Sequence, residues 1–277
     1  MNKKILIIIV NYKKIQEVVN CINSLEKNTY SICLVDNETN QENYEILKKI
    51  KDIKLILNKT NRGFAGGNND AIKKFPNFDY YLLLNSDTKI VEKNWLNTLI
   101  EYMEKNKEIG IIGPKLLNSD KTTQRSCGYN TIFGTKPIKG DEIEKIDWIS
   151  GAVFLIRKEV IKKIGYLDEI YNPAYYEEND YCVRAKKAGF KIVYYPKTKI
   201  IHFNKGSQEK LNNLVQRNKL IFILKNFPLH WLLIRIPFEL IVFFREFFKE
   251  KKIPEQYFFI LKNIKKIIKN RKKIYFL

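Results

Sequence analysis

Residues that build metal clusters and disulfide frameworks are scarce in this chain of 277 residues. It holds four cysteines and two histidines, no two cysteines are spaced as CxxC, and no histidine-rich segment accompanies them. A zinc or disulfide scaffold is therefore not expected. The cysteines are predicted to be reduced, mostly buried thiols of a cytosolic protein, and they are Cys21, Cys33, Cys127 and Cys182.

A long apolar segment is missing from the N-terminal region. The apolar run of residues 4–10 is too short to combine the hydrophobic region and the cleavage site of a signal peptide. Polar residues interrupt it directly afterwards, at Asn11, Tyr12 and Lys13. A buried first strand is the better interpretation of this run.

Acidic residues are also in short supply, since 30 Asp and Glu stand against 50 Lys and Arg, a formal net charge of +20. From residue 205 onward, 17 basic residues face five acidic ones, so this short C-terminal region carries more than half of the excess. Such a charge indicates nucleic acid, anionic lipid or phosphorylated substrates as partners. No recognisable nucleic-acid-binding motif is present, so nucleic acid is the least favoured partner.

Short apolar segments alternate with segments of helical periodicity through the first half of the chain. Continuous apolar runs are typical of strands covered on both faces, and here they occupy residues 4–10, 31–35, 53–57 and 80–84. Helices are expected over residues 13–27 and 41–51, and after a glycine-rich turn at residues 61–67. This order predicts βαβ units and a mostly parallel sheet in an α/β fold.

The second half of the chain is less regular. Residues 110–117 and 148–157 are predicted to be further strands, and residues 118–146 a mobile polar connection. A helix is expected from about residue 209 to 225, before a strongly apolar segment over 228–248 and a lysine-rich tail from 249.

Polar residues follow each predicted strand of the first half. Because parallel strands end at one edge of the sheet, where open α/β sheets bind ligands, these polar loops are expected to form one site. The loops contain Asn11 and Tyr12, Asp36 and Asn37, residues 58–67, and residues 85–87.

Two of these loops indicate nucleotide or sugar binding. Asp36 can accept hydrogen bonds from a base or ribose, and a helix cap or turn is the equally weighted alternative. The run NRGFAGGNND at residues 61–70 permits positive φ and close backbone approach, with a plain tight turn as the alternative. Its spacing is neither GxGxxG nor a P-loop, so it signals neither a dinucleotide fold nor an ATPase.

Two residues are candidate metal ligands. Asp87 ends a buried strand beside Asn85 and Ser86 and can hold Mg²⁺ or Mn²⁺ against a diphosphate, because these hard ions share oxygen ligands with substrate phosphates. Capping a helix over residues 91–102 is the alternative role for Asp87. His202 ends an apolar run and is either a metal or phosphate ligand or a satisfied structural residue.

The acids Glu177, Glu178 and Asp180 fall within four positions at the start of an expected helix, in YYEENDYCVRAKKAG (175–189). In a chain with few acids, this concentration suggests a site that handles a proton or a cation. The alternative is structural, since the helix dipole favours acids in a first turn and Asp180 with Arg184 forms an i, i+4 pair.

Taken in order, these segments resemble family 2 inverting glycosyltransferases of the GT-A fold, and more narrowly their bacterial and archaeal rhamnosyltransferase-like branch. The resemblance extends over about 220 residues, and its segments are VNY (10–12), LVDN (34–37), NRGFAGGNN (61–69), LLLNSD (82–87), WISGA (148–152), YYEENDYCVRAKKAGF (175–190), IIH (200–202) and QRNKLIFILKN (216–226).

The resemblance implies a GT-A nucleotide-diphospho-sugar transferase fold, in which helices flank a Rossmann-like, mostly parallel sheet. The catalytic domain would occupy residues 1–204, with a nucleotide-sugar half over 1–117 and an acceptor half over 118–204, before a basic, apolar helical extension over 205–277. The implied reaction moves a sugar from a nucleotide-diphosphate donor to a hydroxyl of a glycan or lipid-linked acceptor in cell-surface glycan synthesis. A rhamnosyl donor is the narrower expectation.

The resemblance also assigns residue roles. It makes Glu178 the catalytic base, with Glu177 and Asp180 as supporting groups, and gives Asp87 and His202 to an Mg²⁺ or Mn²⁺ ion. The acceptor side would contain Trp148, Ser150 and Gly151. The nucleotide sugar would contact Asn11, Tyr12, Asp36, Asn61, Gly63, Phe64, Gly66, Gly67, Asn68, Asn85 and Ser86.

The chain departs from the family pattern at two places. The DxD-like position reads Asn85-Ser86-Asp87, which leaves one carboxylate for the metal. The acidic motif usually reads Glu-Asp-x-Asp, whereas here Glu178 stands where an Asp is expected. The added methylene moves the carboxylate by roughly an ångström, and such displacements are costly in catalysis.

Charges inside the apolar segment 228–248 argue against a membrane span, since it contains Arg235, Glu239 and Arg245. A helix lying in the interface of an anionic leaflet fits this pattern better. We therefore expect peripheral attachment to the cytoplasmic face of the membrane, with packing on the catalytic domain as the alternative. A nucleotidyltransferase or a non-catalytic family member is the alternative function.

Overall fold

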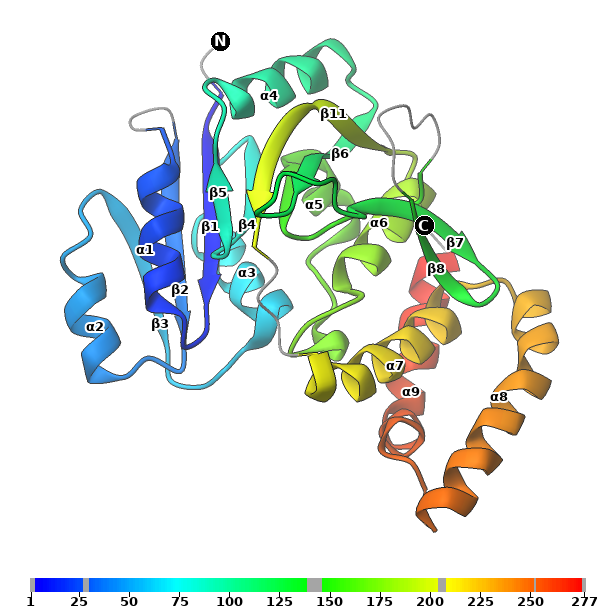
Figure 1. The fold of residues 1–277 in the computed structure, drawn as a ribbon. Helices are drawn as coiled ribbons and strands as arrows, with labels where there is room; N and C mark the ends of the chain where they lie inside the picture. The colour runs from blue at the N-terminus through cyan, green and yellow to red at the C-terminus, as the bar shows by residue number, and fades with distance from the viewer. Residues whose placement is uncertain (1–2, 27–29, 139–145, 204–207, 252, 276–277) are drawn as a thin grey trace. The chain divides into compact units, whose positions relative to one another are not determined.

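The computed structural model describes residues 3–26, 30–138, 146–203, 208–251 and 253–275 (Figure 1). Its internal contacts group the chain into two units. The first unit comprises residues 1–128 and 137–205, and the second comprises residues 129–136 and 206–277. Residues 129–136, which the sequence-based division placed in the acceptor half of the catalytic domain, group here with residues 206–277.

An eight-stranded sheet forms the centre of the first unit, in the order β3-β2-β1-β4-β10-β6-β11-β5. Strands β10 and β5 run antiparallel to their neighbours and the other pairs are parallel, which confirms the predicted mostly parallel sheet. The strands are β1 (Ile5–Asn11), β2 (Ser31–Asn37), β3 (Ile53–Asn58), β4 (Tyr80–Asn85), β5 (Thr88–Ile90), β6 (Ile109–Leu117), β10 (Val153–Arg157) and β11 (Lys191–His202).

Helices cover both faces of this sheet, which explains why its central strands are continuous apolar runs. Ile7 of β1 belongs to a core cluster with α1 (Ile15–Ser24) and α4 (Trp95–Lys105), and α2 (Gln41–Leu47) adds Leu47 to it. Ile8 points to the opposite face and joins a second cluster with α3 (Gly63–Lys74), α5 (Lys158–Ile164) and α6 (Glu177–Lys187).

The polar ends of the first four strands are level with one another. Asn11 pairs in register with Asp36, Asn37 with Asn58, and Val10 with Asn85. The chain order reverses around β1, between β2 on one side and β4 on the other. The carboxyl ends therefore meet at a topological switch point, the usual ligand crevice of an open α/β sheet.

The glycine-rich segment is helical rather than a turn, because α3 already begins at Gly63. Only Gly63 has a positive φ there, of 68°. Gly67 serves close packing, since a Cβ on it would lie 2.9 Å from Cγ1 of Val10. The small side chains thus let α3 approach β1, and the predicted turn over residues 61–67 is corrected.

The connection over residues 118–146 contains regular structure, contrary to expectation. Strands β7 (Cys127–Thr131), β8 (Gly134–Ile138) and β9 (Trp148–Ile149) form a second sheet in the order β8-β7-β9. The predicted strand over residues 148–157 divides into β9 and β10, because the polar and small residues 150–152 interrupt it. Residues 139–145 of this connection lie outside the described residues.

The second unit is built from the helices α7 (Gln208–Asn226), α8 (Leu229–Glu250) and α9 (Glu255–Tyr275). Helices α7 and α9 pack together, and Arg271 of α9 donates to the carbonyl oxygens of Leu224 and Phe227 over 2.8 Å each. Within the described residues, none of these helices combines the length and apolarity needed to span a bilayer.

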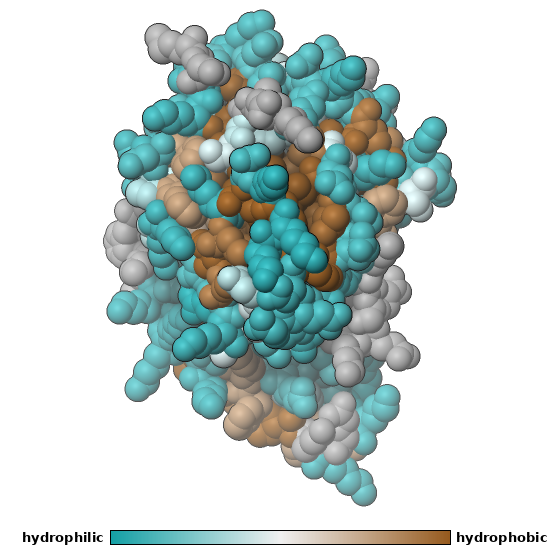
Figure 2. All heavy atoms as spheres, turned by 90° about the vertical axis from the view of Figure 1, so that its left-hand side faces the viewer, coloured by the Kyte–Doolittle hydropathy of each residue, from teal (hydrophilic) through white to brown (hydrophobic). Residues whose placement is uncertain are grey.

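Strand β3 lies at the edge of the main sheet. Figure 2 looks onto this side of the molecule and shows apolar side chains gathered in the middle of a hydrophilic surround. Leu57 of β3 is exposed, and Ile53 and Leu55 are half-buried. The ligand edge and this apolar side are therefore different parts of the first unit.

Candidate active site

Asp36 lies at the end of β2 with a carboxylate that is fully buried. Asn11 Nδ2 donates to its Oδ1 over 2.6 Å. Its Oδ2 is buried and has no hydrogen-bond partner among the described residues. Asn40, not Asp36, caps α2, so the helix-cap alternative is wrong. One buried acceptor is thus left for a ligand, and Tyr12, which follows Asn11 in the chain, is exposed.

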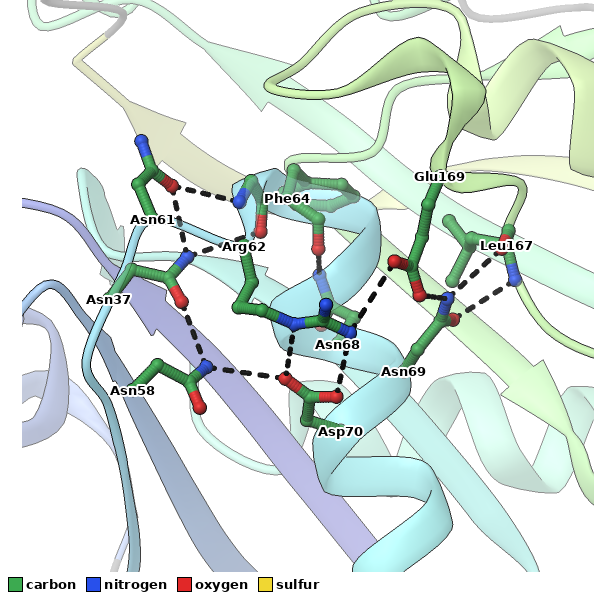
Figure 3. Close-up of polar contacts among 11 residues, drawn as sticks. Asn37, Asn58, Asn61, Arg62, Phe64, Asn68, Asn69, Asp70, Leu167 and Glu169 are labelled. Atoms are coloured by element: carbon green, nitrogen blue, oxygen red, sulfur yellow. Dashed lines mark hydrogen bonds and ion pairs between the residues drawn. The ribbon is translucent and has the colours of Figure 1, made fainter.

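A network of amide side chains clamps the start of α3 to the strand ends (Figure 3). Asn37 Nδ2 donates to Asn61 Oδ1 over 3.4 Å and to the Gly63 carbonyl over 3.2 Å. Asn58 donates to Asn37 and to Asp70, over 3.0 and 3.2 Å. Asn61 in turn accepts from the Gly63 amide over 2.8 Å. Asn61 and Gly63 therefore shape the site's wall.

The same helix is fastened to the segment that precedes α6. Asn69 donates to the Leu167 carbonyl and to Glu169, over 3.0 Å each, and Arg62 forms an ion pair with Glu169 at 3.4 Å (Figure 3). Asn68 is buried, and its Nδ2 donates to the Phe64 carbonyl over 2.9 Å. The contacts of Asn69 and Arg62 with this segment join residues that are about a hundred positions apart in sequence.

Glu178 faces two residues from distant parts of the chain. A Cβ on Gly151 would lie 3.5 Å from Cβ of Glu178 and 3.5 Å from Cζ of Phe64. Both distances are ordinary van der Waals contacts, so Gly151 lies within contact range of the Glu178 side chain and of the Phe64 ring. The structure thus brings together one predicted residue each from the nucleotide-sugar, acceptor and catalytic groups.

The two glutamates at the start of α6 titrate differently. Removal from water raises the pKa of the Glu178 carboxyl to about 7. Burial and then the Glu178 charge raise the pKa of Glu177 well above its usual range. Glu177 is 4% exposed and Glu178 is half-buried, so Glu177 keeps the proton while Glu178 can exchange one near neutral pH. A carboxyl with this pKa suits acid–base chemistry.

Tyr175 lies near both the two glutamates and Asp87, which follows β4. Burial raises the pKa of its phenol, and the charges of Glu177, Glu178 and Asp87 raise it further. The phenol therefore lies in the field of all three carboxylates. Tyr175 was not among the predicted site residues, because an aromatic residue ahead of a helix has no distinctive sequence signal.

Asp87 and His202 lie side by side, with 3.2 Å between Oδ1 and Nε2. The pairing of β5 with β11 causes this, since His202 is in register with Thr88, the residue after Asp87. Asn94 occupies the N-cap position of α4, so the helix-cap alternative for Asp87 is wrong. Asn85 and Ser86 are half-buried beside this pair in the chain.

Gln124 determines how the His202 ring presents its nitrogens. Gln124 Nε2 donates to the His202 carbonyl over 2.5 Å, so its Oε1 is the atom 3.0 Å from Nδ1. An amide oxygen only accepts, so Nδ1 carries a hydrogen and Nε2 is the nitrogen that faces Asp87. An imidazole nitrogen and a carboxylate oxygen at this distance can share a proton or a metal ion. The sequence contained no signal for Gln124.

The predicted acceptor residues have different positions. Gly151 faces Glu178, whereas Trp148 is buried in the core cluster on the α6 face. The Ser150 amide donates to the Ser126 carbonyl over 2.7 Å, and Ser150 Oγ accepts from the Ala152 amide over 3.2 Å. Trp148 and Ser150 therefore fix the junction between β9 and β10, and Gly151 lies within this junction.

The sequence profile described as glycosyl transferase family 2 matches residues 6–165, more than half of the chain. The protein belongs to this family. It is 28% identical over 197 residues to the low-salt glycan biosynthesis hexosyltransferase Agl10 of Haloferax volcanii, covering 67% of this chain and 62% of that protein. It is 26% identical to the poly-beta-1,6-N-acetyl-D-glucosamine synthase of Staphylococcus epidermidis, covering 56% and 39%.

A third relative of this family 2 member has a match that covers most of both proteins. This is the N-acetylglucosaminyl-diphospho-decaprenol L-rhamnosyltransferase of Mycobacterium tuberculosis, 21% identical over 227 residues, with 70% of this chain and 73% of that protein covered. The first two matches span less than two thirds of their relatives' length.

Solved structures of other transferases share the fold. GalNAc-T7 with UDP, GalNAc and Mn²⁺ superposes with a TM-score of 0.64 at 15% identity, over 80% of this chain and 47% of that one. The mannosyltransferase PcManGT of Pyrobaculum calidifontis with GDP-Man and Mn²⁺ gives 0.59 at 11% identity, over 81% and 64%. The predicted GT-A fold is confirmed.

The family fold implies a divalent metal, and the residues present fit one. Among the described residues no cluster of three or more His, Cys, Asp or Glu could hold an ion. Asp87 and His202 nevertheless supply one carboxylate oxygen and one imidazole nitrogen, turned toward each other by β5 and by Gln124. Such a two-residue set suits an ion that takes its other ligands from substrate phosphates and water.

Asp180 has a structural position in this family 2 member. Its carboxylate is fully buried, pairs with Arg184 at 2.9 Å and accepts from the Tyr171 hydroxyl over 3.1 Å. Arg184 also donates to the carbonyls of Ile164 and Tyr166, over 2.9 Å each. The Asp180–Arg184 pair therefore ties α6 to the segment before it, as the i, i+4 interpretation predicted. Because its carboxylate is fully buried, Asp180 is shielded from the hydroxyl of an acceptor substrate.

Replacing Asp180 by Ala is expected to lower the free energy of unfolding by about 3–5 kcal/mol, because it leaves the Arg184 guanidinium buried without its partner. Urea denaturation followed by circular dichroism measures this change. Lys191→Ala is the matched control, since its ion pair with Glu108 is exposed and such pairs contribute little to stability. Equal destabilisation by both variants would contradict the structural role of Asp180.

Proposed function

We propose that this protein is an inverting glycosyltransferase. It moves a sugar from a nucleotide-diphosphate donor to a hydroxyl of a glycan or lipid-linked acceptor, in the synthesis of cell-surface polysaccharide or glycan. The observation that carries the proposal is the placement of Glu178, with a pKa near 7, beside Gly151 and Phe64. Through Tyr175 this carboxyl shares its surroundings with Asp87.

The reaction would be a single in-line displacement at the anomeric carbon of the donor sugar. Glu178 would take the proton of the acceptor hydroxyl as general base, while the deeper Glu177 keeps its own proton. The free Oδ2 of Asp36 would accept a hydrogen bond from the nucleoside. Asp87 and His202 would hold Mg²⁺ or Mn²⁺, which when bound supplies positive charge for the leaving nucleoside diphosphate.

The relatives support this proposal and leave the sugar open. Agl10 is a hexosyltransferase of low-salt glycan biosynthesis, and the mycobacterial relative is an N-acetylglucosaminyl-diphospho-decaprenol L-rhamnosyltransferase. Two structural neighbours were crystallised with a nucleotide or nucleotide sugar and Mn²⁺. A rhamnosyl donor and a lipid-linked acceptor are therefore the first pair to test.

The C-terminal unit would attach the enzyme to the cytoplasmic face of the membrane. Its helix α8 exposes Ile234, Ile241 and Phe248, each more than half exposed and spaced seven residues apart. Exposed lysines accompany the apolar side chains of α9. A basic, amphipathic surface of this kind binds the interface of an anionic leaflet.

A screen of nucleotide sugars for donor hydrolysis and transfer, with Mg²⁺ and Mn²⁺, is expected to identify one active donor. Glu178→Gln should then lower the transfer rate at least about 100-fold, because the base is lost. The wild-type rate should rise with pH through about 7, since Glu178 acts in its deprotonated form. Glu108→Gln, at an exposed carboxylate, is the control and should transfer normally.

Near-normal turnover by purified Glu178→Gln would refute the base assignment. Failure of the wild-type protein to hydrolyse or transfer any nucleotide sugar would favour the non-catalytic alternative.

Mn²⁺ affinity is expected to depend on Asp87 and, indirectly, on Gln124. Titration followed by electron paramagnetic resonance, with a nucleoside diphosphate present, should show specific Mn²⁺ binding that Asp87→Ala abolishes. Gln124→Leu should weaken it about tenfold, as for other residues that orient a metal-binding histidine. Asp120→Ala, in an exposed turn, should leave it unchanged. Undiminished binding by Asp87→Ala would exclude this metal site.

Membrane attachment is tested by sedimentation with vesicles. The full-length protein is expected to sediment with vesicles of phosphatidylglycerol at moderate salt and to be released as salt is raised, because lysine attraction to lipid phosphate is screened. Vesicles of phosphatidylcholine are the control and should retain less protein. Absence of the protein from both pellets would refute peripheral attachment.

A further inference from the structure

The second unit contains an apolar groove of about 350 Å³ between α8 and the pair α7 and α9. Its floor is made by buried side chains such as Leu220 and Ile223 of α7 and Ile260 of α9. Its α8 wall presents Leu233, which is 61% exposed, and further apolar residues at helical spacing, Leu229, Ile236 and Leu240. A volume of this size is typical of sites for elongated small ligands.

Helix α8 is apolar on its outer side as well. Ile234 and Ile241 do not line the groove, yet they are 55% and 67% exposed. A second protein in the groove would leave this outer face in water. A lipid membrane would cover both sides of α8. The bilayer interface would receive the outer side, and one hydrocarbon chain would fill the groove.

The surroundings of the groove suit an anionic head on that chain. Helix α9 carries the exposed residues Lys262, Lys265, Lys266 and Lys269 beside the exposed apolar residues Phe258 and Leu261. None of these lysines is among the residues that line the groove, and their charge attracts the phosphates of an anionic interface, to which a lipid phosphate belongs.

A buried polar pair interrupts the apolar wall. Arg235 is 8% exposed, forms an ion pair with Glu239 and donates to the Ile132 carbonyl over 3.1 Å, and Tyr257 donates to Glu239 over 3.2 Å. Arg235 Nε is buried and has no hydrogen-bond partner among the described residues. Arg235, Glu239 and Tyr257 thus pair with one another, and the other residues that line the groove are apolar, which suits a hydrocarbon chain.

We propose that this groove binds the hydrocarbon chain of a lipid-linked, anionic acceptor. The proposal rests on the proposed glycosyltransferase function, and it adds a site for the acceptor's lipid part. It separates two roles of the C-terminal helices. The outer face of α8 holds the protein at the interface, and the groove selects one chain.

Calorimetric titration of the full-length protein with geranylgeranyl monophosphate below its micelle concentration tests the groove. The wild-type protein is expected to bind it. Leu233→Trp fills the groove and should weaken binding about tenfold, because a ring that displaces about two methylene groups removes their burial. Ile234→Trp adds the same ring on the outer face and should bind within about twofold of wild type. Equal thermal unfolding of both variants checks their folding.

Several outcomes would overturn the proposal. These are absence of binding by the wild-type protein, equal binding by both variants, and binding of inorganic phosphate as tight as that of the prenyl phosphate. A dimer that Leu233→Trp dissociates, without prenyl phosphate binding, would assign the groove to a second copy.

Parallel assays separate this site from the proposed function. Both tryptophan variants should still hydrolyse the donor, because neither Leu233 nor Ile234 belongs to the residues proposed to act in catalysis or donor binding. Loss of donor hydrolysis by the wild-type protein would refute the enzyme assignment while leaving the calorimetric result intact.

Discussion

The docking of α3 onto the segment before α6 is the constraint on which the rest of the site depends. The Phe64 amide donates to the Pro173 carbonyl over 2.7 Å, and a Cβ on Gly63 would lie only 2.7 Å from that oxygen. The ion pair of Arg62 with Glu169 closes the same junction. Helix α3 is itself anchored to the strand ends. This junction therefore places the start of α6, and with it Glu178, at the polar edge of the sheet.

Burial of the Glu177 and Glu178 carboxyls at the start of α6 is unfavourable, and neighbouring interactions in the helix offset this cost. A buried carboxyl such as Glu177 is unfavourable when charged, and burial together with the Glu178 charge favours its protonated form. Three residues further on, Asp180 is also buried, but Arg184 pairs with it and holds the adjoining backbone. One short helix therefore combines a carboxyl that exchanges its proton near neutral pH with an ion pair that fixes its position.

Sequence reasoning located the strands and their polar ends because both signals are local. The buried strand before Asp87 and the acids after Tyr176 could be recognised from runs of a few residues. The glycine-rich segment was wrongly predicted to be a turn, because glycines that pack a helix against Val10 cannot be distinguished in the sequence from glycines of a turn. The hairpin of β7 and β8 was missed because polar, partly exposed strands lack the apolar run that marked the others.

The sequence by itself determined the alternation of strands and helices, the parallel sheet and the identity of the acids, because apolar periodicity and charge depend on neighbours in the chain. Only the tertiary structure decided which acid has a pKa near neutral pH and which forms an ion pair with Arg184. It also decided which nitrogen of His202 faces Asp87. Those outcomes depend on burial and on contacts such as Gln124 with His202, 78 positions apart. Neither burial nor such a contact can be read from residue order, because both arise only when the sheet closes distant segments together.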